Sequence, residues 1–313
     1  MSAKGFFKRR RISPPGGWEP PEIRIRILRR DAADSEPYEQ CFRYIPAELQ
    51  ETVATALQRL NAAETLRDDK GEPAAPVSWE CSCLQKKCGA CAMVINGRPG
   101  LACDARLSDY KGEIRLEPLR KFPVVRDLIV DRTALYDNLR EMKLWVPESG
   151  GTQDGNADTR AQDTGDCPQD TENRVQHTKD RARNTENRAR NTEKRARNAG
   201  TSSGSTGAEW TEARAELGYE ASRCLLCGCC LEVCPNFLPD GGFFGMAAGV
   251  PASRLLASLP AEQQAELAGL YRTHVYEGCG KSLACRNICP AGIDIDRMLV
   301  NSNAVAVWKR SLK

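Results

Sequence analysis

The sequence predicts an α+β protein, in which a mixed N-terminal domain precedes an all-α C-terminal domain. Segments with the alternation of half-buried strands lie before about residue 120, whereas helical spacing dominates from residue 210 onward. A highly polar segment, with almost no large apolar residue, separates these regions. Cysteines are grouped in both regions, which indicates that each domain is built around thiolate sites.

The expected elements follow from local periodicity. Ile23, Ile25 and Ile27 fall on one side of a strand, with arginines between them. Asn96-Gly97 is a strong hairpin-turn signal directly after an apolar run. In the N-terminal region we expect strands at 22–29, 39–45, 92–95 and 113–117, helices at 50–60 and 127–145, and a cysteine loop at 81–91. In the C-terminal region we expect helices at 209–223, 261–275 and 293–309.

Composition divides the chain into four segments. Residues 1–21 form a basic, Pro/Gly-rich tail, which we expect to be solvated rather than bound to an anionic membrane. Residues 22–147 form the first domain with a connecting helix, and residues 210–313 form the second. Residues 148–209 turn from acidic to basic and contain a seven-residue repeat without apolar positions. We expect a disordered insertion there, because it cannot bury enough apolar surface to offset its ordering entropy. The alternative is an arm that binds anionic lipid or a partner.

Composition also excludes several classes of function. The formal net charge of +3 argues against a dedicated nucleic-acid-binding protein. No apolar run is long enough to span a membrane, and the first residues lack the apolar core of a secretory signal. The chain has fifteen cysteines but only two histidines, His177 and His274, and no Cys-x-x-Cys is followed directly by a histidine. Covalent haem and a Rieske centre are therefore excluded, and thiolate metal sites are favoured over disulfides.

The first cysteine group has the spacing of a plant-type [2Fe–2S] site. Cys83, Cys88 and Cys91 follow the C-x4-C-x2-C pattern, and Cys103 supplies the fourth thiolate. Gly89 lets the backbone approach a cluster and direct N–H groups toward sulfur. The alternative is a zinc knuckle, which this spacing suits poorly.

The second group has the C-x2-C-x2-C-x3-C-P run of bacterial ferredoxins, and a second copy follows downstream. In two-cluster ferredoxins the fourth cysteine of each run binds the other cluster. The predicted ligands of a [4Fe–4S] cluster are therefore Cys224, Cys227, Cys230 and Cys289.

The second copy has a serine, Ser282, in place of its second cysteine. Its cluster is left with three thiolates, those of Cys234, Cys279 and Cys285. A corner iron without a thiolate is easily lost, so we expect a [3Fe–4S] cluster. The alternative is that a serinate binds a fourth iron.

Four cysteines remain outside these ligand sets. We expect Cys41 to be a small core residue, and Cys81 to lie beside the first site without binding. Cys229 is expected to pack near the clusters without binding, and Cys167 has no assigned role. We expect His274 to be a helix residue, with a proton relay as the alternative.

Three clusters in one chain indicate a path for single electrons between a two-electron site and a distant acceptor. No G-x-G-x-x-G follows a predicted strand, so no nucleotide site of that kind is present. We therefore expect an electron-transfer subunit whose substrate chemistry lies in a partner. The alternatives are a soluble multi-cluster electron carrier that serves another flavoprotein, and a zinc-bound structural adaptor.

The chain resembles the iron–sulfur subunit of succinate dehydrogenase and fumarate reductase. The order of the three cysteine patterns carries this resemblance, and residues 116–145 are similar to the family's segment between the two domains. The resemblance implies a plant-type ferredoxin-like (β-grasp) domain, followed by a bacterial-ferredoxin-like domain. It further implies an oxidoreductase complex with an FAD flavoprotein, a cytochrome b-type membrane anchor and a quinone. The chain would then lie at the cytoplasmic face of the bacterial inner membrane, held through the anchor.

Two positions depart from relatives that bind ubiquinone beside the [3Fe–4S] cluster. Those relatives have a tryptophan and a histidine where this chain has Pro239 and Gly280. Residues 234–245 (CPNFLPDGGFFG) look more like relatives with a dihaem anchor, which implies menaquinone. A thiol-driven fumarate reductase subunit is a related alternative, which we do not expect, because such subunits carry appended Cys-Cys-Gly motifs and this sequence contains none.

Overall fold

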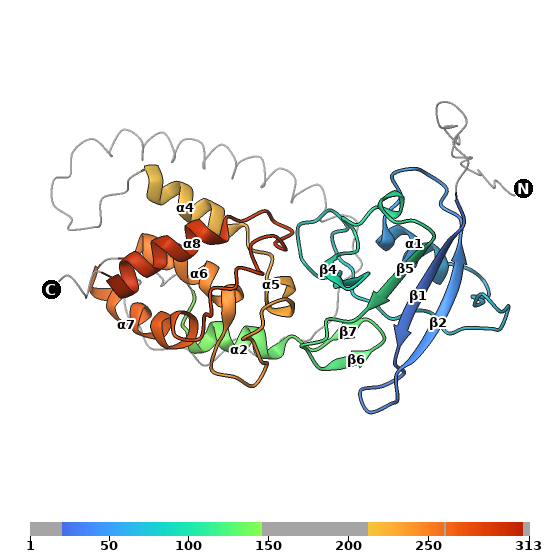
Figure 1. The fold of residues 1–313 in the computed structure, drawn as a ribbon, viewed down its shortest axis with the longest axis horizontal. Helices are drawn as coiled ribbons and strands as arrows, with labels where there is room; N and C mark the ends of the chain where they lie inside the picture. Colours follow the sequence, from blue (N-terminus) through green and yellow to red (C-terminus); the bar gives the residue numbers. More distant parts are fainter. Residues whose placement is uncertain (1–20, 146–211, 260, 309–313) are drawn as a thin grey trace, which may run out of the picture. The chain divides into compact units, whose positions relative to one another are not determined.

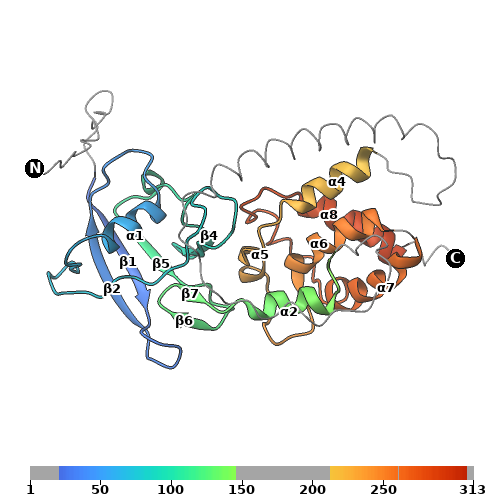
Figure 2. The ribbon, with the colours of Figure 1, turned by 180° about the vertical axis from the view of Figure 1, so that it is seen from behind.

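The computed structural model describes residues 21–145, 212–259 and 261–308. Its N-terminal half contains a five-stranded mixed sheet with the strand order β2-β1-β5-β3-β4 (Figure 1). The strands are β1 (Ile23–Arg29), β2 (Tyr38–Tyr44), β3 (Ala92–Ile95), β4 (Arg98–Leu101) and β5 (Glu113–Glu117). Strand β1 is antiparallel to β2 and parallel to β5. Helix α1 (Val53–Asn61) crosses one face of this sheet (Figure 2).

Local sequence explains most of these elements. The three isoleucines of β1 are at most 1% exposed, as the alternation predicts. Thr52 caps α1, because its hydroxyl accepts a hydrogen bond from the Thr55 N–H. Asn96 and Gly97 have φ values of 47° and 77°, and they form the predicted turn between β3 and β4. A short 3₁₀ turn, Leu107–Asp109, precedes β5.

The helix expected at 127–145 begins later than predicted. Its first part forms a small hairpin of β6 (Val124–Arg126) and β7 (Ile129–Val130), and helix α2 spans only Thr133–Glu141. Asp127 stands at the hairpin turn with a φ of 45°, a conformation that no helix continues. Just before α2, the carboxylate of Asp131 accepts a hydrogen bond from the Thr133 N–H at 2.8 Å, which forms a local turn at the start of the helix.

The described part of the C-terminal half contains helices and no strand, so the α+β prediction is confirmed. Helix α6 lies among α4, α7 and α8, as both views show (Figures 1 and 2). Helix α6 was not predicted, because it contains Gly249 and Pro251 and is buried on most sides, so its apolar residues show no helical period. The helical elements are α4 (Glu212–Ser222), α5 (Cys229–Glu232), α6 (Gly245–Ser258), α7 (Ala261–Tyr271), a π-helical turn Arg272–Tyr276, α8 (Ile295–Asn303) and a π-helical turn Ala304–Trp308.

The segment after β5 packs against the C-terminal half. Leu119 and Phe122 share one buried cluster with Leu231 and Phe237, and the Phe122 and Phe237 ring centroids are 6.1 Å apart. Met142, just after α2, belongs to a second cluster that is formed mainly by α6 and α7. The expectations for the basic tail, the charged insertion and Cys167 lie outside the described residues.

Candidate iron–sulfur cluster sites

Backbone N–H groups converge on the sulfur atoms of the first cysteine loop. The N–H groups of Gln85 and Lys87 each donate to Cys83 Sγ at 3.3 Å. The Lys86 N–H donates to Cys103 Sγ at 3.3 Å, although these residues are far apart in sequence. Hydrogen bonds of this kind stabilise thiolates and tune bound clusters.

Residues other than glycine with a positive φ, in the left-handed backbone region, occur in all three cysteine loops. Leu84 and Lys86 have φ values of 53° and 58° in the first loop. Leu226 has a φ of 50° in the second, and Lys281 and Leu283 have φ values of 55° and 53° in the third. Such residues are strained, and strained backbone is concentrated at functional sites. The same bends form concave arrays of N–H groups that suit anions, including thiolates.

The four thiols of the first group lie together. The Gln85 and Lys87 N–H groups, followed by the Cys88 thiol, lower the pKa of Cys83 to about 7. Burial, together with the neighbouring Cys103 thiol, raises the pKa of Cys91 to about 12. The structure therefore brings together the four cysteines that the spacing predicted.

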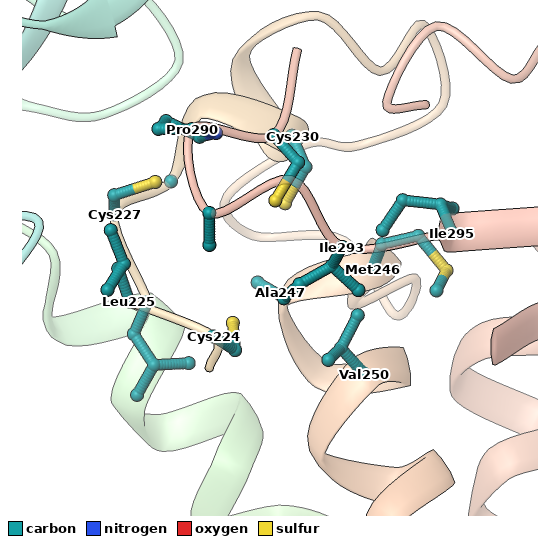
Figure 3. Close-up of a pocket in the computed structure, with 14 residues that line it drawn as sticks. Cys224, Leu225, Cys227, Cys230, Met246, Ala247, Val250, Pro290, Ile293 and Ile295 are labelled. Carbon is teal, nitrogen blue, oxygen red and sulfur yellow. The ribbon is translucent and has the colours of Figure 1, made fainter. Parts of the chain in front are cut away.

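The second site is a largely apolar pocket that four cysteines line, namely Cys224, Cys227, Cys230 and Cys289. The sulfur atoms of Cys224 and Cys230 point into the space beside Met246, Ala247 and Val250 of α6 (Figure 3). Burial raises the pKa of Cys224 to about 11, and the nearby Cys227 and Cys289 thiols add to this rise. Cys289 thus lies with the first run, although it belongs to the second.

The third group consists of the remaining cysteines of the two runs, Cys234, Cys279 and Cys285. Burial raises the pKa of Cys285 to about 11, and the charges of Cys234, then Cys279 and then Asp296 add to this rise. Cys234 therefore lies with the second run, in exchange for Cys289. Ser282 is exposed in the described structure.

These thiol groups fit clusters better than single ions. Among the described residues, no three His, Cys, Asp or Glu side chains are arranged to hold one metal ion. A four-thiolate zinc site needs every sulfur about 2.3 Å from one ion. In a [4Fe–4S] cluster each thiolate binds a different iron, and in a [2Fe–2S] cluster two thiolates share each iron, so four sulfur atoms around a cluster lie farther apart than four around one ion.

The other cysteines and the histidine have different surroundings. Cys81 is exposed, and Cys229 is fully buried in the core beside Leu231. The expectation of a core position for Cys41 was wrong, because it pairs with Arg26 on the outer face of the sheet and is only partly buried. His274 lies in the π-helical turn, where its Nδ1 is 2.9 Å from the Gly242 carbonyl oxygen.

Sequence reasoning missed two basic residues beside these loops. The Lys121 ammonium donates to the carbonyl oxygens of Cys234 and Phe237. Arg132 donates to the Ala90 carbonyl oxygen at 3.1 Å, within the first cysteine loop. Both lie in segment 116–145, which contains six Lys and Arg residues, so no local signal distinguishes these two.

Comparison with known proteins agrees with this arrangement. A family model described as a 2Fe-2S iron-sulfur cluster binding domain matches residues 24–137, and one described as a 4Fe-4S dicluster domain matches residues 220–293. These matches confirm the predicted pair of ferredoxin-like domains and two of the three cluster types. A chain of the Mycobacterium smegmatis Sdh1 complex in the apo form has the same fold, with a TM-score of 0.56 and 20% identity over 93% of this chain and 98% of that chain.

Two relatives are similar over most of their length. The fumarate reductase iron-sulfur subunit of Haemophilus influenzae (strain ATCC 51907 / DSM 11121 / KW20 / Rd) is 28% identical over 240 residues, which cover 75% of this chain and 73% of the relative. The succinate dehydrogenase iron-sulfur subunit of Bacillus subtilis (strain 168) is 32% identical over 284 residues, which cover 90% of this chain and 91% of the relative. This chain therefore belongs to the family of iron–sulfur subunits of succinate dehydrogenase and fumarate reductase.

Proposed function

We propose that this chain carries electrons between the FAD of a partner flavoprotein and a quinone or haem in a membrane anchor. Bound clusters supply one-electron carriers in series, and the chain supplies thiolates, backbone donors and an apolar surrounding. Succinate and fumarate chemistry belongs to the flavoprotein. We place the chain at the cytoplasmic face of the bacterial inner membrane, held through the anchor. Among the described residues no helix is long and apolar enough to cross a bilayer.

The proposed ligand sets follow the cysteine groups. A [2Fe–2S] cluster takes Cys83, Cys88, Cys91 and Cys103; a [4Fe–4S] cluster takes Cys224, Cys227, Cys230 and Cys289; a [3Fe–4S] cluster takes Cys234, Cys279 and Cys285. The observation that carries this assignment is the exchange of Cys289 and Cys234 between the two runs. That exchange is typical of two-cluster ferredoxins.

We further propose menaquinone as the quinone and a dihaem protein as the anchor. Gly280 replaces the histidine of ubiquinone-binding relatives, and a Cβ at this position would meet Asn236 Nδ2 at 2.9 Å. The Asn236 amide is itself held, since it donates to the Gly278 carbonyl oxygen at 2.7 Å. This packing supports an arrangement without an imidazole at position 280.

The first test is electron paramagnetic resonance (EPR) on the anaerobically purified full chain, with an iron and zinc count. We expect a [3Fe–4S] signal in the oxidised protein and a [2Fe–2S] signal after dithionite reduction. Co-expression with a flavoprotein and a membrane anchor should yield a complex that reduces menaquinone with succinate. The proposal would be contradicted if the protein contained zinc and gave neither EPR signal, and if reconstitution with iron and sulfide also produced neither signal.

Two neighbouring cysteines allow a matched test of the ligand set. Cys83→Ser should abolish or alter the [2Fe–2S] signal, because Cys83 Sγ is the acceptor of two backbone N–H groups. Cys81→Ser should leave that signal unchanged, because Cys81 lies at the surface. The reverse result would move the ligand from Cys83 to Cys81.

A further inference from the structure

The loops of the first and second sites meet at Gly89. A Cβ at this residue would lie 2.9 Å from Cys227 Cβ and 2.7 Å from the Leu225 carbonyl oxygen. The next residue, Ala90, accepts a hydrogen bond from Nη2 of Arg132 at 3.1 Å. Arg132 therefore holds the first loop at the point where that loop touches the second.

Arg132 is largely enclosed at this junction. Its side chain is 12% exposed, and its Nη1 lies 3.0 Å from a carboxylate oxygen of Glu80, which is 39% exposed. The Nε of Arg132 is buried, and within the described ranges it has no hydrogen-bond partner. A buried donor without an acceptor is costly and requires an explanation. A cluster bound beside either loop would supply sulfur acceptors for such a donor.

The charge of Arg132 acts on the second loop as well as on the first. Gly89, next to Ala90, contacts Cys227, so the guanidinium that holds Ala90 lies beside both loops. A cation that favours a thiolate also favours a reduced cluster. Reduction adds one electron and no proton, so it makes the cluster more negative.

We propose that Arg132 is a positioning residue of the junction between the [2Fe–2S] and [4Fe–4S] sites. It holds Ala90 against the Cys227 loop, and its positive charge raises the reduction potential of the clusters on both sides. Glu80 partly neutralises this charge, so that the pair sets the potential together. The inference rests on the proposed function, since it requires clusters at both sites.

An EPR-monitored redox titration of the purified, cluster-loaded full chain tests the inference. Arg132→Gln should lower the midpoint potentials of both clusters, with a roughly tenfold change in the reduction equilibrium of the more strongly affected one, or about 59 mV for a one-electron couple. Arg132→Lys keeps the charge and should restore most of the potential. Glu80→Gln removes the neutralising carboxylate and should shift the potential in the opposite direction.

Arg140→Gln is the matched control. Arg140 lies on α2, its side chain is 75% exposed, and it pairs with Asp137 at 2.6 Å. Its removal subtracts the same charge from the chain and should leave both potentials unchanged, because solvent screens it.

The outcomes separate this inference from the proposed function. Normal EPR signals with unshifted potentials in Arg132→Gln and Glu80→Gln would overturn the inference alone. A wild-type chain without clusters would overturn both. If Arg132→Gln fails to assemble, Glu80→Gln still decides, since a raised potential supports the inference and an unchanged one overturns it.

Discussion

Arg29 and Asp127 form an ion pair that the N-terminal half encloses. Their exposed fractions are 0% and 1%, and the guanidinium donates to the two carboxylate oxygens at 3.0 and 2.9 Å. The same guanidinium also donates to the carbonyl oxygens of Ala75 and Pro76, and the carboxylate accepts from the Ser78 N–H. The pair therefore fixes the segment that leads into the first cysteine loop.

We expect Asp127→Asn to lower the free energy of unfolding by about 3–5 kcal/mol, because it leaves a buried guanidinium without its counter-charge. Denaturant titration followed by circular dichroism measures this change. Glu113→Gln is the control, since Glu113 forms an exposed pair with Arg26 and its loss should have a much smaller effect. Equal effects of the two substitutions would refute the assigned role of the buried pair.

The same pair predicts a pH dependence. Burial by itself raises the pKa of Asp127, but the hydrogen bonds from Arg29 and the Ser78 N–H outweigh it and hold that pKa below its usual value. A carboxyl of this kind stabilises the fold fully above its unfolded pKa of about 3.9, and the stabilisation disappears as the pH falls through the folded pKa. The difference in unfolding free energy between wild type and Asp127→Asn should be complete at pH 7 and shrink below about pH 4. A difference that stays constant from pH 7 to pH 3 would contradict this.

In the proposed ligand set, the serine at position 282 determines the type of the third cluster. We expect Ser282→Cys to restore a fourth thiolate, so that the oxidised [3Fe–4S] signal disappears and the iron content rises by one per chain. Ser282→Ala separates the alternative in which serinate binds iron. It should leave the EPR signals and iron content unchanged, whereas a loss of iron would indicate serinate ligation.

At the scale of elements, two glycines in different turns have almost the same backbone conformation. Gly89 and Gly97 have φ values of 76° and 77°. A Cβ at Gly97 meets nothing within 4 Å, whereas a Cβ at Gly89 overlaps with Leu225 and Cys227. An alanine would therefore be strained to the same extent at either position, but only at Gly89 would its side chain overlap with neighbouring atoms.

We expect Gly97→Ala to cost about 1–2 kcal/mol in unfolding free energy and to leave the clusters unaffected. Gly89→Ala should in addition displace the first loop from the Cys227 loop and slow electron transfer between the first two sites. Pulse reduction followed by optical and EPR detection measures that rate. If both substitutions change the rate equally, contact with the second loop is not the cause.

Elements with a strong local signal were predicted, whereas elements fixed by tertiary contacts were not. The alternation of β1 and the Asn96-Gly97 turn depend on neighbouring residues, and both were confirmed. The late start of α2 depends on Asp127, whose partner Arg29 is 98 residues away. Helix α6 contains Gly249 and Pro251, and its burial on most sides removes the period that identifies a surface helix.

At the scale of the whole chain, Lys121 joins the connecting segment to the C-terminal half. Its backbone N–H donates to Glu232 at 3.1 Å, and its ammonium donates to the carbonyl oxygens of Cys234 and Phe237. We expect Lys121→Met to cost about 1–3 kcal/mol, because it leaves these carbonyls without that donor. Hydrogen exchange should become faster in residues 228–237.

Lys143→Met is the control for this contact. Lys143 also reaches the C-terminal half, through Glu266, but both side chains are more than half exposed. Its removal should change hydrogen exchange little, since exposed pairs contribute little to stability. A comparable effect of the two substitutions would contradict a special role for Lys121.

The sequence by itself determined the family, the order of the cysteine groups and the predicted cluster types. These features depend on spacing along the chain, because a short loop around a compact cluster permits few separations between thiolates. The tertiary structure alone decided that Gly89 touches Cys227 and that Arg132 and Lys121 lie beside the cysteine loops. Those contacts join segments more than 40 residues apart, up to 138 for Gly89 and Cys227, and packing within and between the two halves fixes them. No local pattern of residues specifies such contacts, because side chains that meet across a core need not share any sequence period.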